Sequence, residues 1–235
     1  MKQLQNRLHT PEELDNLSLS GTPLKRTLQS LKFINSVLGN HRQLGTAVLE
    51  YCRANQNTNE IHIVDLGCGG GDCITYLSKK LEKSRVKAHF IGIDGNPHSI
   101  DYAIKNNPNP KQIDYKVANI IDPAFKVPDC DLLISSHFMY HFDNEGLLVF
   151  LKKIESGTIK HVIFSELYRN VIAYYLFKFI RHLLPISHIA KKDGLIAIQR
   201  AFSVFELKKI IEDFGIKKFK ILKKPFFRLI IKIDL

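Results

Sequence analysis

The sequence lacks the features that mark membrane, secreted and repeat proteins. No run of about 18 apolar residues is free of charges, so no membrane-spanning helix is expected. The first residues, MKQLQNRLHTPEELD, include no apolar stretch of the signal-peptide type, and we therefore expect a cytoplasmic protein. Internal repeats and low-complexity linkers are also absent. With 45% hydrophobic and 24% charged residues, the composition is that of a globular chain, for which we predict a single domain over residues 1–235.

Cysteine is scarce and shows no pairing pattern. The four cysteines, Cys52, Cys68, Cys73 and Cys130, form no CxxC pair, and a chain of 235 residues is too large to need disulfide staples. We therefore expect reduced thiols, as is usual in the cytoplasm. A zinc site would need histidine or carboxylate ligands gathered from distant positions, so no metal is predicted.

Positive charge is in excess and is unevenly distributed. Residues 191–235 carry 12 Lys or Arg against 5 Asp or Glu, and so hold +7 of the net +11. Such a patch can face nucleic acid or anionic lipid. Because no RNA-binding motif with interleaved aromatic residues accompanies it, a solvated face is favoured and no specific nucleic-acid partner is expected.

The first 59 residues are predicted to be helical. A one-faced helix is indicated by apolar residues at steps of three and four, namely Leu24, Leu28, Leu31, Ile34 and Leu38. A second helix is expected from about His41 to Arg53, and a polar break follows at 55–59.

From residue 60 onward, short apolar runs alternate with helical segments. Strands are predicted at 61–67, 87–94, 113–119, 130–136 and 160–166, with helices near 72–83, 97–107 and 143–155. An amphipathic helix over 203–215 precedes two strand-like runs, 219–224 and 226–234, which are too closely spaced to pair in parallel. The pattern predicts a doubly wound α/β fold: seven strands, mostly parallel, with helices on both faces and an antiparallel C-terminal strand.

A glycine-rich loop follows the first predicted strand in VDLGCGGGD, residues 64–72. Glycines at 67, 69 and 71 let a strand turn into a helix and let a ligand approach the backbone. The spacing differs from the dinucleotide fingerprint GxGxxG, and no GK[ST] of a P-loop is present. Asp65 at the mouth of the loop would repel a pyrophosphate, but it would suit a ligand that carries an ammonium group.

Two further polar residues follow the next strands. Asp94 ends the run IGID, where a carboxylate can accept hydrogen bonds from both hydroxyls of a ribose. Asn119 ends IDYKVAN, and its amide can accept from an adenine amino group and donate to a ring nitrogen. Strand, loop and acids together predict a nucleoside-containing ligand.

These features resemble the class I S-adenosylmethionine-dependent methyltransferases. The resemblance rests on VDLGCGGGD, on GIDGNP (92–97), VANIID (117–122) and DCDLLISSHFMYHF (129–142), and on the C-terminal hairpin, and it covers about residues 60–235. It implies a Rossmann-like fold, S-adenosylmethionine as cofactor and S-adenosylhomocysteine as product. Asn119 stands where the family usually has Asp.

The resemblance also implies a set of cofactor contacts. Around the loop and the strand ends these are Asp65, Gly67, Cys68, Gly69, Gly71, Asp94, Gly95, Asn119, Ile120, Ser136 and His137. Arg42, in the helical segment before the sheet, is a further candidate, because a guanidinium can hold the cofactor carboxylate in a bidentate fork.

Two histidines are candidate catalytic residues. Methyl transfer displaces a neutral leaving group, so the enzyme mainly positions the nucleophile, but a hydroxyl acceptor also benefits from a base. His141 is the first candidate and His137 the second, because both follow the fourth strand and histidine titrates near neutral pH. The alternative is that His141 only packs in the turn.

A long insertion, residues 166–202, separates the fifth strand from the last helix. Its apolar strip predicts a helical lid over a substrate pocket (167–202), an extra core helix or a peripheral membrane contact, in that order of preference. The predicted acceptor-binding residues are His141, Tyr174, Phe177 and Arg200, and Asp193 and Gly194 are expected to shape the same pocket.

The predicted activity is methyl transfer to a small apolar acceptor that is hydroxylated and aromatic or quinone-like. Segments 21–42 and 191–207 resemble methyltransferases of the ubiquinone/menaquinone type and those tied to aromatic polyketides. RNA methylation and cofactor binding without turnover are the alternatives. A monomer or a homodimer is expected.

Overall fold

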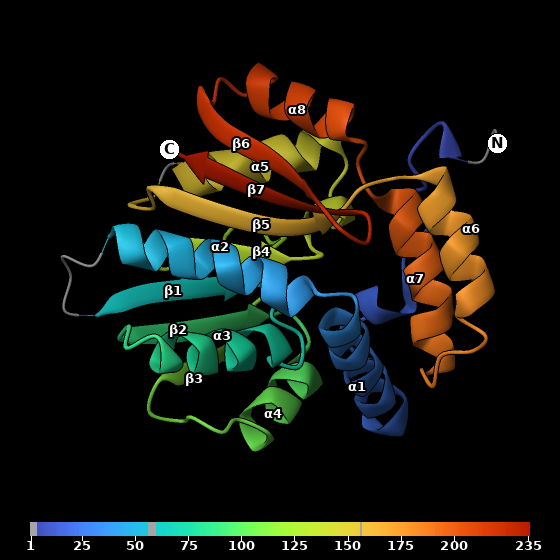
Figure 1. Cartoon of the computed structure of the whole chain (residues 1–235), viewed down its shortest axis with the longest axis horizontal. Coiled ribbons are helices and arrows are strands. Elements are labelled where there is room, and N and C mark those ends of the chain that lie inside the picture. The colour runs from blue at the N-terminus through green and yellow to red at the C-terminus, as the bar shows by residue number, and fades with distance from the viewer. Residues whose placement is uncertain (1–3, 56–59, 156) are drawn as a thin grey trace.

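The computed structural model describes residues 4–55, 60–155 and 157–235, so most of the predicted polar break at 55–59 lies outside the described residues. One sheet of seven strands runs through the molecule in the order β3-β2-β1-β4-β5-β7-β6 (Figure 1). The strands are β1 (Ile61–Leu66), β2 (Ala88–Asp94), β3 (Ile113–Val117), β4 (Leu132–Ser136), β5 (His161–Leu167), β6 (Lys218–Lys224) and β7 (Arg228–Asp234). Strands β1 to β5 pair in parallel, and β7 is antiparallel to both β5 and β6. The predicted fold is confirmed.

Helices cover both faces of the sheet (Figure 1). They are α1 (Gly21–Val37), α2 (Asn40–Ala54), α3 (Asp72–Lys83), α4 (Pro97–Lys105), α5 (Asn144–Glu155), α6 (Val171–Ile180), α7 (His188–Arg200) and α8 (Val204–Asp213). Two short 3-10 turns, η2 (Glu13–Asp15) and η3 (Met139–His141), complete the description. Helices α6 and α7 form the insertion after β5, and α1 lies beside α7 at the same end of the molecule.

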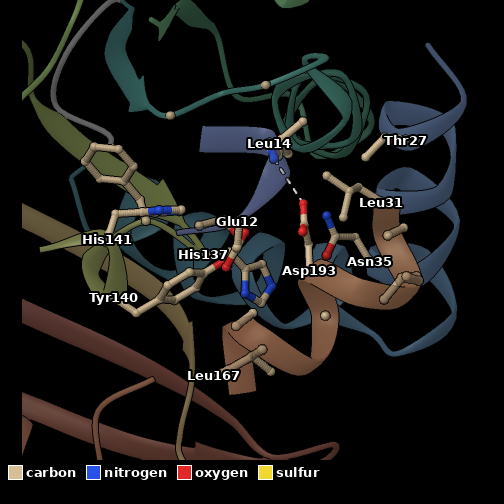
Figure 2. Close-up of a pocket in the computed structure, with 18 of the residues that line it drawn as sticks. Glu12, Leu14, Thr27, Leu31, Asn35, His137, Tyr140, His141, Leu167 and Asp193 are labelled. Atoms are coloured by element: carbon tan, nitrogen blue, oxygen red, sulfur yellow. Dashed lines mark hydrogen bonds between the residues drawn. The ribbon is translucent and has the colours of Figure 1, made fainter. Parts of the chain in front are cut away.

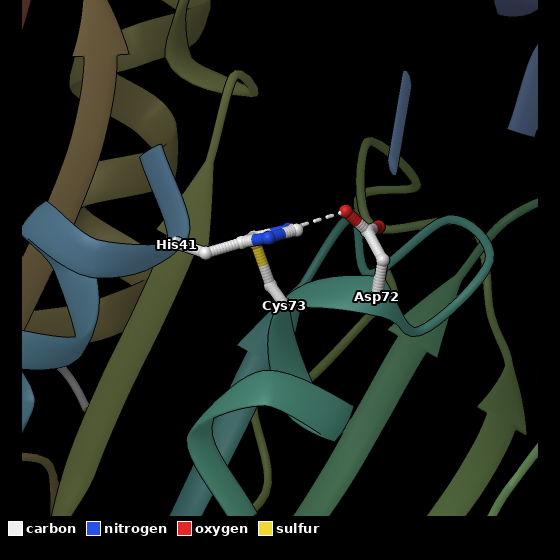
Figure 3. A group of neighbouring side chains, drawn as sticks. All are labelled: His41, Asp72 and Cys73. Carbon is white, nitrogen blue, oxygen red and sulfur yellow. Dashed lines mark hydrogen bonds and ion pairs between the residues drawn. The ribbon is translucent and has the colours of Figure 1, made fainter. Parts of the chain in front are cut away.

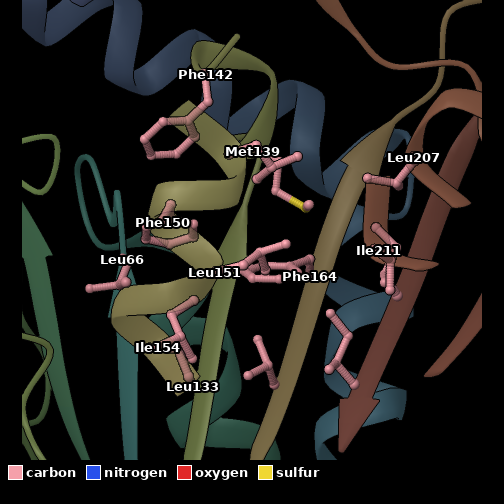
Figure 4. Packing of buried hydrophobic residues seen from close by; sticks show 14 of the residues in the cluster. Leu66, Leu133, Met139, Phe142, Phe150, Leu151, Ile154, Phe164, Leu207 and Ile211 are labelled. Carbon is pink, nitrogen blue, oxygen red and sulfur yellow. The ribbon is translucent and has the colours of Figure 1, made fainter. Parts of the chain in front are cut away.

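Alternation along the strands divides the core into two layers. In β1, Ile61 and Ile63 pack with α2 and α3 on one face, whereas Val64 and Leu66 pack with α5 and α8 on the other. Figure 4 shows this second layer, in which Phe150 of α5 lies among apolar residues of the sheet. The two layers hold the strands rigidly and so fix the positions of the loops at their carboxyl ends.

The C-terminal hairpin forms as predicted, but β7 begins at Arg228 rather than at residue 226. Phe226 and Phe227 have φ of 61° and 56°, a left-handed conformation that belongs to the turn and not to a strand. The sheet therefore ends with β6 as an edge strand. Lys218, Lys220 and Lys223 project from this edge into solvent, where charged side chains discourage pairing with another sheet.

Three expectations drawn from composition concern the cysteines, membrane-spanning helices and the C-terminal positive charge. All four cysteines are free thiols. Among the described helices, none combines the length and the apolar character that crossing a membrane requires. Of the 12 basic residues in 191–235, four belong to the edge strand β6, and three of these are exposed, whereas Arg200 and Arg228 are buried.

Candidate functional site

A cavity of about 620 Å³ opens at the carboxyl ends of the parallel strands. Ligands of open α/β sheets bind at this edge. Its floor consists of the loops after β1, β2, β3 and β4, and its walls come from α1, α6, α7 and the N-terminal segment around η2. Figure 2 shows side chains from these separate elements converging on the cavity, including Glu12, His141 and Asp193.

The glycine-rich loop turns back against β2. The N–H groups of Gly67 and Cys68 both donate to the Ile93 carbonyl, over 2.8 and 3.0 Å. Gly67 and Gly69 have φ of 74° and 52°, which residues with a side chain rarely adopt, and both line the cavity. Gly71, also predicted as a contact, precedes α3 with φ of 74° but is not part of the cavity lining.

Asp65 is a buried carboxyl with unused hydrogen-bonding capacity. It is 2% exposed and lines the cavity, and its Oδ1 has no partner. Burial, and then the charges of Asp72 and Asp94, raise its pKa well above the ordinary value. A buried hydrogen-bond acceptor without a donor destabilises the fold. This carboxyl therefore suits a ligand that carries a cationic donor.

Asp94 is held by the backbone on both oxygens. Oδ2 accepts from the Gly69 N–H and Oδ1 from the Asn96 N–H, each over 2.9 Å, while burial raises its pKa. The carboxyl therefore has a fixed orientation beside the loop. Gly95, Asn119 and Ile120 line the cavity next to it.

Helix α2 buries His41 rather than Arg42, and His41 contacts Asp72, which lines the cavity. Arg42 is exposed and absent from the cavity lining, so the predicted role in holding the cofactor is not supported. His41 is buried and its Nε2 lies 2.6 Å from Asp72 Oδ2, with Cys73 alongside (Figure 3). Burial and then the charge of Asp72 raise the pKa of the Cys73 thiol well above its usual value. Periodicity identified the helix but not which residue faces inward.

His137 is placed at the cavity but its ring is already engaged. Its Nε2 lies within hydrogen-bonding distance of Arg228 Nη1, and because guanidinium can only donate, Nε2 accepts. Burial and then Arg228 lower the pKa of His137 well below its ordinary value. A neutral imidazole whose lone pair is occupied cannot take a proton from an acceptor, so the geometry argues against the catalytic role predicted for His137.

His141 has the arrangement expected of an oriented base. It lies in η3, lines the cavity, and its Nδ1 is 2.9 Å from Asp15 Oδ1. The other oxygen of Asp15 is 2.6 Å from Arg200 Nη1. Burial opposes ionisation of Asp15, but the hydrogen bonds from His141 and Arg200 outweigh it and lower its pKa. An ionised Asp15 keeps the proton on Nδ1 and leaves Nε2 as the acceptor of the ring.

The N-terminal segment is fastened to α7. Asp193 accepts from the N–H groups of Glu13 and Leu14, each over 3.0 Å, and Figure 2 draws the second of these bonds. Asp193 thus shapes the pocket by anchoring this segment. Sequence analysis missed Glu12 and Asp15 because the segment has no apolar period, although the acidic run PEELD was a visible signal.

The outer half of the cavity is apolar. Leu28, Leu31 and Ile34 of α1 face Leu176, Phe177 and Ile180 of α6 across it. Phe177 lines the cavity, as predicted. Arg200 also lines it, and its guanidinium group forms an ion pair with Asp15. Tyr174 does not line the cavity, because it is buried between α6 and α7 instead.

Comparison with known proteins agrees with this geometry. Residues 63–157 match a family model described as a methyltransferase domain, whereas a comparison with curated proteins gives no match. Magnesium protoporphyrin IX methyltransferase from Synechocystis PCC 6803 is 17% identical, with a TM-score of 0.57 over 86% of this chain and 87% of that one. A Methanococcus maripaludis protein of proposed S-adenosyl-L-methionine-dependent activity is 13% identical (TM-score 0.63, 92% and 96% covered). The plantazolicin methyltransferase BpumL is 14% identical (TM-score 0.66, 90% of each chain).

Residues 63–157 thus match a methyltransferase domain, and the strand order with its antiparallel β7 is that of the Rossmann-like methyltransferase fold.

Proposed function

We propose that the enzyme transfers a methyl group to a small apolar acceptor that carries a hydroxyl group and is aromatic or quinone-like. The observation that carries this proposal is the continuity of one cavity. Its inner half holds the glycine-rich loop and the acids at the strand ends, and its outer half is lined by apolar residues of α1 and α6. A volume of about 620 Å³ is within the range of sites for small molecules.

The residues of the inner half fit S-adenosylmethionine. The unpartnered oxygen of Asp65 suits the ammonium group of the methionine part, and Asp94 suits the ribose hydroxyls. Asn119 is assigned to adenine, with Ile120 against the ring. The remaining part of the cofactor is assigned to the backbone of Gly67, Cys68 and Gly69 and to the segment Ser136–His137. When bound, the cofactor supplies an electrophilic methyl group on sulfur with a neutral leaving group.

In the proposed mechanism His141 takes the proton of the acceptor hydroxyl. Asp15 holds Nδ1 over 2.9 Å, so Nε2 is the proton acceptor, and Arg200 keeps Asp15 ionised and in place. The apolar walls exclude water and position the oxygen for in-line attack. The helical insertion 167–202 acts as the lid of this single-domain enzyme.

Nothing in the comparisons supports the RNA alternative. The lysines of β6 form an exposed edge rather than a wall of the cavity. Cofactor binding without turnover is the remaining alternative, and only an assay of methyl transfer can separate it from catalysis.

A peripheral contact between α6 and a membrane is a second proposal. One face of α6 packs on α7, but Ile172, Phe179 and the following Leu183 are 67%, 73% and 76% exposed. Large apolar side chains that are mostly exposed and neighbour one another are unusual on a soluble surface. Lys178 is exposed on the same helix and suits anionic lipid.

The decisive experiment supplies labelled S-adenosylmethionine with either a metabolite extract or RNA. The proposal expects label in an apolar small molecule and none in RNA. Label in RNA would overturn it. Binding of S-adenosylhomocysteine by calorimetry with no transfer to either mixture would favour the non-catalytic alternative.

A further inference from the structure

Arg228 occupies an unusual position for an arginine. It is the first residue of β7, paired with Leu167 of β5, and its side chain is 1% exposed. The guanidinium group extends to Nε2 of His137 at the end of β4. Arg228 is nevertheless one of the residues that line the cavity. A buried cation therefore faces the space that the ligands occupy.

This cation has no anionic partner within the described part of the chain. Among residues 4–55, 60–155 and 157–235, no carboxylate lies within ion-pairing distance of Arg228, and its Nε has no hydrogen-bond partner. The Cys73 thiol and then the Glu166 carboxyl are the groups whose charge most raises the pKa of Arg228 from a distance. One oxygen of Glu166 is held by the N–H groups of Phe138 and Met139, over 2.8 and 2.9 Å.

The charge of Arg228 is not quenched by its neighbours. Burial lowers its pKa to about 10, which still leaves it protonated at neutral pH. His137 is neutral and only accepts one hydrogen bond, while burial raises the pKa of Glu166 to about 7. A buried charge without a counter-ion is costly. An anion supplied by a ligand would remove that cost, and a carboxylate matches the planar fork of guanidinium.

Only two arginines line the cavity among the described residues, Arg200 and Arg228. Arg200 is committed to Asp15, and Arg42 lies outside the cavity. We propose that Arg228, supported by His137, forms a carboxylate-binding subsite of the cavity. The inference rests on the proposed function, because the carboxylate belongs either to the methionine part of the cofactor or to an acidic acceptor.

Two nucleosides separate these sources. S-adenosylhomocysteine carries the carboxylate, and 5′-methylthioadenosine has the same nucleoside without the amino-acid part. Their affinities are measured by calorimetry for wild type, Arg228→Gln, Arg228→Lys and the control Arg42→Gln, which removes an exposed arginine of α2. Benzoate and benzyl alcohol are then titrated into each protein saturated with S-adenosylhomocysteine. Melting temperatures verify folding, and Arg228→Lys preserves the charge if the glutamine variant fails to fold.

If the cofactor supplies the carboxylate, Arg228→Gln weakens S-adenosylhomocysteine about tenfold or more and leaves 5′-methylthioadenosine within about twofold. Arg228→Lys shows an intermediate loss of affinity, because one ammonium group keeps the charge but cannot form the two parallel hydrogen bonds of a guanidinium group. If the acceptor supplies it, S-adenosylhomocysteine binds normally to every variant. The loaded wild type then binds benzoate but not benzyl alcohol, and Arg228→Gln loses the benzoate.

Several results would overturn the subsite. One is equal losses for both nucleosides in a folded Arg228 variant. Another is unchanged S-adenosylhomocysteine affinity together with no Arg228-dependent benzoate binding. In either case wild type still binds S-adenosylhomocysteine, so the proposed function survives. Failure of wild type to bind S-adenosylhomocysteine at all would instead overturn the proposed function and the subsite with it.

Discussion

Three carboxylates of the cavity differ in how their oxygens are satisfied, and each difference points to a separate role. Asp94 has both oxygens fixed by backbone N–H groups, which orients it for a polar ligand. Asp65 keeps one oxygen without a partner and so requires a donor from outside the chain. Asp15 is shared between His141 and Arg200, which stabilises its charge and prepares the imidazole for proton transfer.

Replacing Asp94 tests the ribose assignment. Asp94→Ala should weaken S-adenosylhomocysteine by about tenfold or more, because a hydrogen bond to a charged group is worth about 1.5–3 kcal/mol. The loop also loses its anchor on the Gly69 N–H. Asp94→Asn is the matched control, since it retains one acceptor for that N–H. Calorimetry that found wild-type affinity in a folded Asp94→Ala would reject the assignment.

Replacing His141 tests proton transfer. His141→Ala should lower turnover by roughly 10²–10⁴-fold with little change in affinity for S-adenosylhomocysteine. Asp15→Asn should lower kcat more than it raises KM, because it removes orientation of the imidazole rather than a contact with the acceptor. Turnover is measured with the acceptor labelled in the metabolite extract. If His141→Ala lost only acceptor affinity and kept its rate at saturation, His141 would be a wall of the pocket.

At the scale of the elements, α6 and α7 approach each other so closely that one position of α7 excludes a side chain. A Cβ at Gly194 would lie 2.5 Å from Cε1 of Phe177. Phe177 is also part of the apolar wall, so the packing of the two helices and the shape of the cavity are coupled.

Gly194→Val should therefore displace Phe177 and impair the acceptor half of the cavity selectively. We expect a raised KM for the acceptor or a reduced turnover, with the affinity for S-adenosylhomocysteine within about threefold of wild type, because overpacking shifts side chains locally. Lys191→Val, on the same helix, controls for the effect of a β-branched residue on α7. A Gly194→Val enzyme with wild-type acceptor kinetics would show that this wall does not bind the acceptor.

The sequence predicts helices and strands whose apolar residues recur at regular spacing. It does not predict residues whose role depends on one contact with a distant part of the chain. Strands and helices from β1 to β7 follow from apolar spacing, and the loop with Asp65 and Asp94 follows from its motif. The buried residue at the start of α2 is His41, one position before the predicted Arg42, because the two side chains lie on different sides of one turn. Asp15 was missed because its partners, His141 and Arg200, are far away along the chain. Arg228 was likewise hidden within an ordinary strand pattern.

At the scale of the whole molecule, the exposed apolar face of α6 combines with a net charge of +11. Wild type should sediment with vesicles of phosphatidylcholine and phosphatidylglycerol, and less with phosphatidylcholine alone, because anionic lipid adds attraction to apolar burial. Phe179→Glu should lower the bound fraction several-fold. Ile104→Glu makes the same change at an exposed apolar residue of α4 and should have little effect. Equal binding of wild type and Phe179→Glu would refute the membrane contact, and loss of a dimer instead would assign this face to a second copy.

The response of stability to pH depends on the acids that the fold buries, and Glu12 is the clearest case. It is 8% exposed, its Oε1 has no partner, and burial followed by the charge of Asp15 raises its pKa from 4.5 to about 8. Between these two values the folded protein binds more protons than the unfolded chain does. The free energy of unfolding should therefore fall as pH rises from about 4.5 to about 8.

Glu12→Gln should remove this part of the pH dependence, because an amide mimics the protonated carboxyl and does not ionise. Urea unfolding at pH 5 and pH 8.5 should show a variant that matches wild type at the lower pH and is more stable by the order of a few kcal/mol at the higher. Burial raises the pKa of Glu166 in the same direction, but Glu166 is present in both proteins and cancels in the comparison. Glu13→Gln removes a carboxylate from the less buried side of the same segment and controls for net charge. Parallel pH profiles for wild type and Glu12→Gln would mean that Glu12 ionises freely in the folded enzyme, and the N-terminal segment would then not close the cavity around it.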